Sequence, residues 1–162
     1  MLRIGLGHDT HRLIEGSFIL LGGVRIEHTK SLLGHSDADV LLHAITDALL
    51  GAAGLGDIGE LFPDTDSANR NRDSGEMLQI AWKQVQQQNW QIVNLDIVLF
   101  AEKPKIAPHK EAIRGHIAEL LNIDISQIGL KAKTGEKIGF IGREEAIAAE
   151  CVVLLSKHRN TS

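Results

Sequence analysis

The chain has little of the chemistry that marks disulfide-linked, secreted or membrane-spanning proteins. It contains one cysteine, three prolines and no tyrosine, and aromatic residues make up 4% of its length. A single cysteine excludes a disulfide framework or a cysteine-rich zinc site built from one chain. No apolar run approaches the ~20 residues of a membrane span, and the first residues, MLRIGLGHDTHRL, lack the apolar core of a signal peptide. We therefore expect a cytoplasmic protein that does not enter a membrane.

The chain also lacks an excess of basic residues. Its net charge of -4 argues against a general nucleic-acid surface, because phosphate backbones are bound mainly by clustered Lys and Arg. Hydrophobic residues make up 43% and charged residues 23%, as in an ordinary globular protein. The length suits one domain, so we expect a single domain over residues 1–157 and a flexible C-terminal tail at 158–162.

The hydrophobic pattern predicts an α+β protein. Ser36, with Asp39 three residues on, looks like the N-cap of a helix that ends near Ala53, and residues 57–72 read as an exposed loop. Strands and helices alternate only irregularly, which favours α+β over a doubly wound sheet. The predicted elements are strands at 2–8, 18–26 (bent at Gly22-Gly23), 91–101, 128–132 and 147–156, and helices at 36–53, 73–88 and 108–121.

Asp9, His11 and His43 form a candidate metal site. Asp9 and His11 stand two residues apart at the end of the first predicted strand, so their side chains point to one face. His43, on the first predicted helix, adds a third ligand, and one Asp with two His leaves an open position, as in catalytic zinc sites. Asp39 and Asp47, four residues either side of His43, could orient its ring. The alternative is that these histidines are ordinary polar residues.

Two further segments suit phosphate chemistry. His35 and Ser36 precede the predicted helix, where a cap alone and a cap with an anion site are equally open interpretations. The segment KTGEKIGF offers Lys133 and Thr134 to phosphate oxygens and Glu136 to a cation such as magnesium, although a solvated loop explains it too. It is not a Walker motif, which needs GxxxxGK[ST].

Several motifs together resemble one enzyme family. In chain order they are GHDTHRL, LGGVRI, HSDADVLLHAITDALLGAAGLGDIGELFPDTD, KPKIAPH and LKAKTGEKIGFIGREEAIAAE. Over about residues 3–157 the sequence resembles the 2-C-methyl-D-erythritol 2,4-cyclodiphosphate synthases. This resemblance implies the conversion of 4-diphosphocytidyl-2-C-methyl-D-erythritol 2-phosphate to the cyclic diphosphate and CMP, a phosphorus–oxygen lyase step of the non-mevalonate route to isoprenoids.

The resemblance also implies an assembly and cofactors. The expected protein is a homotrimer of α+β subunits, each a mixed β-sheet with helices on one face in a ferredoxin-like style, and its active sites lie between subunits. Each site holds zinc through Asp9, His11 and His43, and a magnesium or manganese ion bound by Glu136 accompanies the substrate diphosphate. His35 and Thr134 match the positions that stabilise the transition state.

Matching substrate-binding positions cover the whole substrate. The methylerythritol and phosphate side is matched by Ser36, Asp57, Ile58, Gly59, Phe62, Pro63, Asp64, Thr65, Asp66, Phe140 and Arg143. The cytidine side is matched by Ala101, Glu102, Lys103, Pro104, Lys105, Ile106, Ala107, Lys133 and Gly135. The sequence departs from the family pattern at KTGE, where many relatives carry two or three threonines, and at His8, where an aromatic residue is common.

Two other classes remain open at this point. A metal-dependent phosphohydrolase would use metal-bound water and leave no cyclic diphosphate. A non-catalytic trimer that binds isoprenoid diphosphates is suggested by the apolar last strand and by Arg143 with Glu145. Binding without release of CMP would favour that protein.

Overall fold

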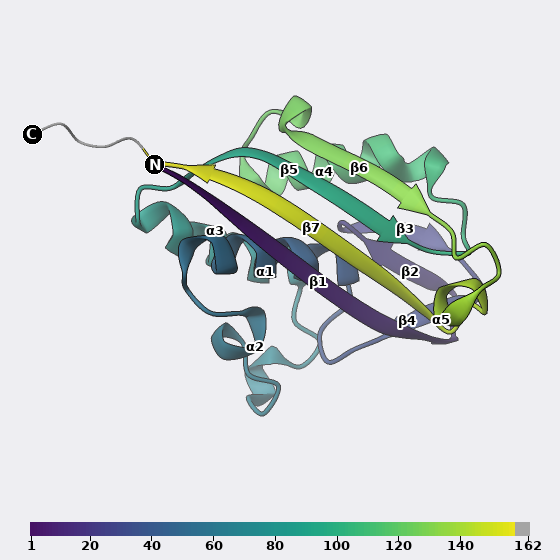
Figure 1. Cartoon of the computed structure of the whole chain (residues 1–162). Coiled ribbons are helices and arrows are strands. Elements are labelled where there is room, and N and C mark those ends of the chain that lie inside the picture. Colours follow the sequence, from purple (N-terminus) through teal and green to yellow (C-terminus); the bar gives the residue numbers. More distant parts are fainter. Residues whose placement is uncertain (158–162) are drawn as a thin grey trace, which may run out of the picture.

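A five-stranded mixed sheet organises the computed structural model, which describes residues 1–157 (Figure 1). The expected tail at 158–162 lies outside the described residues. In spatial order the strands are β4 (Lys30–Leu33), β1 (Leu2–Glu15), β7 (Ala146–Ser156), β5 (Gln91–Phe100) and β6 (Ile128–Lys133). β5 and β6 are parallel and the other neighbours are antiparallel. The expected α+β class with a mixed sheet is confirmed.

Three long helices cover one face of this sheet, as expected, and leave the other face open (Figure 1). They are α1 (Val40–Ala53), α3 (Ser74–Gln87) and α4 (Lys110–Leu121). Burial alternates along β1: Gly5 and Gly7 face the helices and are buried, whereas Ile4 and Leu6 face away and are exposed. The hydrophobic core therefore lies between the sheet and the helices.

α1 lies unusually close to β1 because glycines face it. A Cβ added at Gly7 would lie 1.9 Å from the carbonyl oxygen of Ala44, and one at Gly5 would lie 1.9 Å from that of Ala48. Only glycine allows the two backbones to approach so closely. This approach sets the helix directly over the strand segment that carries Asp9.

Asp39, and not Ser36, caps α1. Its carboxylate accepts the N–H of Leu42 (3.1 Å) and also the N–H groups of Gly22 (2.9 Å) and Gly23 (2.6 Å). These glycines have φ angles of 60° and 74° and form the turn between β2 (Phe18–Leu21) and β3 (Val24–Glu27), a separate hairpin. The predicted Ser36 cap is wrong, because the buried carboxylate three residues on satisfies both the helix end and the hairpin turn.

The first strand is longer than predicted. It continues from residue 8 to Glu15 because its second half pairs with both β7 and β4, so Asp9 and His11 lie inside the strand. β4 has four residues and no periodicity to reveal it, and it was not predicted. The remaining elements are short: α2 (Ile58–Leu61), α5 (Gly139–Gly142) and 3₁₀ turns at Ser67–Asn69, Ala107–His109 and Ile125–Gln127.

No helix within residues 1–157 has the length and apolar character to cross a membrane.

Candidate metal centre

Three ligand atoms from β1 and α1 converge on one point. The Oδ2 atom of Asp9 lies 2.9 Å from His11 Nε2 and 2.9 Å from His43 Nδ1, and the two nitrogens are 3.1 Å apart. Among residues 1–157 this is the one group of three or more His, Cys, Asp or Glu side chains placed to share an ion. In a tetrahedral zinc site with bonds of ~2.0–2.1 Å, ligand atoms lie about 3.3 Å apart. The three predicted residues therefore fit a metal ion with an open fourth position.

The other nitrogen of each ligand histidine has a partner. Nδ1 of His11 lies 2.8 Å from the carbonyl oxygen of Leu33, which can only accept, so in a neutral ring Nε2 carries the lone pair that a metal needs. Nε2 of His43 lies 2.8 Å from Ser74 Oγ and 3.0 Å from Ser36 Oγ. Such contacts fix the ring orientation that a metal ligand needs.

The predicted role of Asp39 and Asp47 in orienting His43 is wrong. Asp39 is fully buried and is occupied by the N–H groups of the hairpin turn and the helix start. Asp47 accepts the N–H of Ile58 at 2.8 Å, and this contact ties α2 to α1. The spacing along the helix places both carboxylates near His43, but each of them accepts hydrogen bonds from backbone N–H groups instead.

The charges of Asp9 and His11 support each other. Burial by itself raises the pKa of Asp9, but hydrogen bonds from His11 and His43 outweigh burial and hold that pKa well below its usual range. Burial by itself lowers the pKa of His11, but the hydrogen bond and charge of Asp9 raise it overall above 6.5. The lowered pKa keeps Asp9 negatively charged, as a cation ligand must be, whereas the raised pKa of His11 favours a proton where the metal would bind.

A cavity of about 180 Å³ opens beside the three ligands. Its lining residues are Asp9, His11, His35, Ser36, His43, Asp47, Ile58, Gly59, Phe62, Asp64, Asn69 and Met77. The structure thus brings His35, Ser36 and part of the predicted 57–66 segment to the metal site. Asp57 and Asp66 cap the short helices at residues 58 and 67 and do not line the cavity.

Asn69 and Met77 line this cavity but were not predicted. Asn69 is buried, its Nδ2 donates to the carbonyl of Pro63 (2.8 Å), and its Oδ1 accepts from Arg72 (2.9 Å). The polar run around it carries no periodicity, so no sequence signal indicated that the loop folds back on itself. Asn69 therefore holds the loop in place over the cavity.

A second cavity, of about 190 Å³, gathers the predicted cytidine-side residues. Its lining residues are Ala101, Glu102, Pro104, Lys105, Ile106, Ala107, Ala132, Lys133 and Thr134. Gly135 lies beside it and donates its N–H to Glu102 at 3.0 Å, whereas Lys103 pairs with Glu144 at 3.0 Å outside it. Glu136 follows next to Thr134, its Oε1 3.3 Å from the threonine hydroxyl.

The two cavities share no lining residue: β1 contributes to the first, and the ends of β5 and β6 contribute to the second. β1 carries Asp9 and His11, β6 leads into Thr134, and β7 and β5 lie between them. Three strand spacings of ~4.8 Å separate such positions by about 14 Å. Phe140 and Arg143 belong to the α5 segment, where Phe140 is exposed and Arg143 pairs with Glu145 at 2.7 Å.

The chain is similar to known proteins over almost its whole length. A family model described as the YgbB family matches residues 2–156. A protein of Geobacillus sp. (strain WCH70), named 2-C-methyl-D-erythritol 2,4-cyclodiphosphate synthase, is 55% identical over 157 residues, which are 97% of this chain and 99% of that protein.

Two solved structures share this fold. The bifunctional IspDF of Campylobacter jejuni matches with a TM-score of 0.94 and 45% identity over 98% of this chain, which spans 43% of that protein. A 2C-methyl-D-erythritol-2,4-cyclodiphosphate synthase in a CDP-bound form matches with a TM-score of 0.88 and 40% identity, over 95% of this chain and 100% of that one.

Proposed function

Because the chain belongs to the YgbB family, we propose that it converts 4-diphosphocytidyl-2-C-methyl-D-erythritol 2-phosphate to 2-C-methyl-D-erythritol 2,4-cyclodiphosphate and CMP in isoprenoid biosynthesis. The observation that carries this proposal is the convergence of Asp9, His11 and His43 in a chain similar along its length to synthases named for this product. The enzyme is a phosphorus–oxygen lyase.

Zinc is the proposed metal, held by Asp9, His11 and His43. Two imidazole nitrogens and one carboxylate oxygen are a donor set that zinc accepts, and the separations near 3 Å suit its small tetrahedral shell. When bound, zinc supplies Lewis-acid polarisation of a phosphate oxygen at its open position. His35 lines the same cavity, where it would hold charge that develops on the phosphates.

The reaction needs no nucleophile from the protein. An oxygen of the substrate's own 2-phosphate attacks the β-phosphorus, a new P–O–P link forms, and the bond to the CMP phosphate breaks. Cys151 agrees with this scheme, because it is buried and burial raises the pKa of its thiol to about 12. The protein's contribution is to fold the substrate for ring closure, and positioning of that kind can supply ~7–11 kcal/mol.

The second cavity is the proposed cytidine and diphosphate side. The backbone that lines this cavity and the side chains of Lys133 and Thr134 would offer hydrogen-bond donors to the phosphates. Glu136 would bind magnesium or manganese between the α- and β-phosphates. The CDP-bound relative supports a substrate that carries a cytidine diphosphate. The KTGE departure begins at this cavity, which Lys133 and Thr134 line, and there Lys133 would bring a positive charge to the phosphates.

A homotrimer with shared active sites is the proposed assembly. The open face of the sheet exposes Ile4 (73%) and Leu6 (67%), with Leu2 and Val152 beside them, which is an apolar surface suited to contact with other subunits. Because the two cavities of one chain are apart, the metal side of one subunit would complete its site with the cytidine side of a neighbour. The ferredoxin-like style of the subunit stays a prediction.

A cytoplasmic location is part of the proposal. The single cysteine is buried and free, which suits a reducing compartment.

Substitution of one residue in each cavity tests this proposal. We expect His11→Ala to lose zinc and turnover together, and Thr134→Ala to keep zinc and retain measurable CMP release, lowered by roughly 10²–10³ because one charge-stabilising donor is lost. CMP release is followed by chromatography and zinc by elemental analysis. Equal losses of activity with zinc retained in both variants would contradict the assignment.

A further inference from the structure

Ser74 joins the metal centre to the start of α3. It is the first residue of that helix and its side chain is completely buried, with an exposed fraction of 0%. Its Oγ lies 2.8 Å from Nε2 of His43, the ring nitrogen that points away from the metal position. Ser74, thirty-one positions after His43 in the chain, thus contacts the side of the His43 ring opposite to the metal position.

Asp37 decides the direction of this hydrogen bond. One carboxylate oxygen of Asp37 accepts from the Ser74 hydroxyl in a short hydrogen bond, and the other accepts the Ser74 N–H at 3.0 Å. A carboxylate can only accept, so the Ser74 hydroxyl hydrogen points to Asp37. The Ser74 oxygen is then left to accept a hydrogen from His43 Nε2, and a neutral ring protonated there carries its lone pair on Nδ1.

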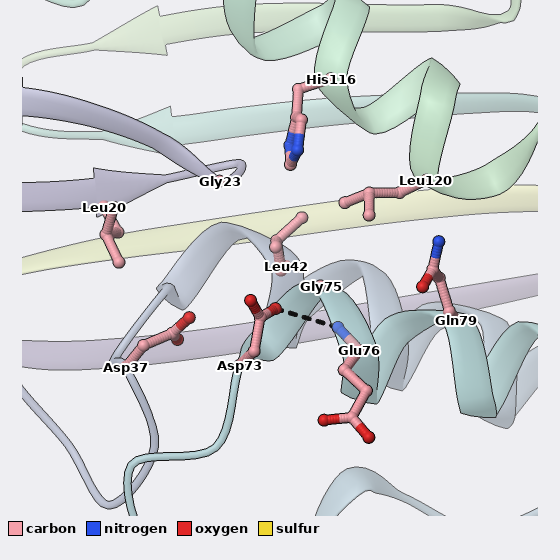
Figure 2. Close-up of a pocket in the computed structure, with 10 residues that line it drawn as sticks. All are labelled: Leu20, Gly23, Asp37, Leu42, Asp73, Gly75, Glu76, Gln79, His116 and Leu120. Atoms are coloured by element: carbon pink, nitrogen blue, oxygen red, sulfur yellow. Dashed lines mark hydrogen bonds between the residues drawn. The ribbon is translucent and has the colours of Figure 1, made fainter.

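The carboxylate of Asp37 is itself held in place. The Oδ1 atom of Asp37 accepts the N–H of Asp39 at 3.1 Å, and the backbone N–H of Asp37 donates to the carbonyl of Arg72 at 3.1 Å. Figure 2 shows Asp37 near Asp73 at a third, open cavity of about 470 Å³. Asp37 is only half-buried, so its charge keeps contact with solvent while its oxygens accept protein hydrogens.

Ser36 is the other neighbour of His43 Nε2. Its Oγ lies 3.0 Å away and accepts the N–H of Ala38 at 3.3 Å. No carboxylate hydrogen bond is present to orient the Ser36 hydroxyl among the described residues, so Ser36 does not select a tautomer in the way that Ser74 does.

We propose that Ser74, oriented by Asp37, is a positioning residue that holds His43 with Nε2 protonated and Nδ1 directed to the metal. The inference rests on the proposed metal site and deepens it. His11 has the matching arrangement, since the Leu33 carbonyl accepts from its Nδ1. Each ligand histidine therefore has an acceptor behind it, one from the backbone and one from the Asp37–Ser74 pair.

The test is zinc affinity, measured by competition with a chromophoric chelator and without substrate. Loss of a hydrogen-bond partner behind a ligand typically weakens metal binding about 10- to 100-fold, and we expect this loss in Ser74→Ala and in Asp37→Ala. Ser74→Thr keeps the hydroxyl and is expected to restore most of the affinity. The matched control is Thr46→Val, which removes another completely buried hydroxyl, one that donates to the Leu42 carbonyl at 2.8 Å on α1.

The melting temperature of each metal-free variant separates positioning from packing. We expect Ser74→Ala and Thr46→Val to lower it similarly, while zinc affinity falls only in Ser74→Ala. Wild-type affinity in Ser74→Ala, or an equal loss of affinity in Thr46→Val, would overturn the inference and leave the proposed function standing. A wild-type protein that binds no zinc would overturn both.

Discussion

At the scale of single residues, the Asp9–His11 pair makes the metal-free protein sensitive to pH. The pKa of Asp9 is lowered below 3.8, so the stability that it contributes is present above that value and is lost as pH falls through its folded-state pKa. The pKa of His11 is raised above 6.5, so its contribution is full below 6.5 and is lost as pH rises through its folded-state pKa. The pair thus stabilises the metal-free protein most between pH 3.8 and pH 6.5.

Zinc binding should have the opposite pH dependence near the pKa of His11: it should strengthen as pH rises. A ligand histidine must be deprotonated, so zinc binding competes with the proton that Asp9 favours on His11. We expect the rise in melting temperature on zinc addition to be small at about pH 5.5 and large at about pH 8. His8→Ala is the control, because His8 faces the other side of β1 beside Glu150 and should change neither value. The same rise at both pH values would contradict this account.

At the scale of elements, the close contact of β1 with α1 builds the metal site. Gly7 lies two residues before Asp9, and the helix carbonyl that it meets belongs to Ala44, the neighbour of His43. The distance between the two elements therefore sets the distance between two ligands. Spacing in the sequence predicted the shared face of Asp9 and His11, but not this glycine contact.

Gly7→Ala should disturb the site through the helix. The new methyl group would overlap the Ala44 carbonyl, so α1 must move outward, and overpacking of this kind costs about 1–3 kcal/mol. We expect lower stability in denaturant unfolding and weaker zinc binding. Gly51→Ala is the matched control, because it adds a methyl group to α1 where no atom lies within 4 Å, and it should stabilise the helix by roughly 0.5–1 kcal/mol. Unchanged zinc affinity in Gly7→Ala would refute the role of this contact.

How far the sequence predicts the structure depends on whether the signal is local. The helix ending near Ala53 and the strand near residue 91 were confirmed, because apolar periodicity and glycine signals lie within each element. The Ser36 cap was wrong because Ser36 and Asp39 are both good caps, and a distant hairpin turn selects Asp39. Ser74 was missed because its contact with His43 joins separate helices, and nothing near it in the chain indicates that contact. The roles of the cytidine-side residues come from the family resemblance and stay predictions.

At the scale of the whole molecule, one chain presents two separate cavities and an apolar sheet face. The metal cavity, beside Asp9, and the proposed cytidine cavity, beside Thr134, share no lining residue. Ile4 and Leu6 are exposed on the open face of the sheet, which would lie between subunits in the proposed trimer. A cyclic assembly with repeated heterologous contacts can join the metal cavity of each subunit to the cytidine cavity of the next.

Mixing two defective variants tests this shared site. His11→Ala and Thr134→Ala are unfolded and refolded together in equal amounts. If each site takes one cavity from each of two subunits, about a quarter of the sites combine two intact cavities, and CMP release should recover to about that fraction of wild type. The control is each variant refolded alone. An activity equal only to the sum of the two controls, or an active monomer in sedimentation, would exclude shared sites.

The most direct test of the central claim is phosphorus NMR of the purified protein with 4-diphosphocytidyl-2-C-methyl-D-erythritol 2-phosphate and magnesium, with and without a zinc chelator. We expect the signals of the cyclic diphosphate and of CMP to appear, and to be absent when the chelator has removed zinc from Asp9, His11 and His43. Open-chain phosphate products would indicate a hydrolase. Unchanged substrate with a folded, zinc-loaded protein would contradict catalysis and favour a binding protein.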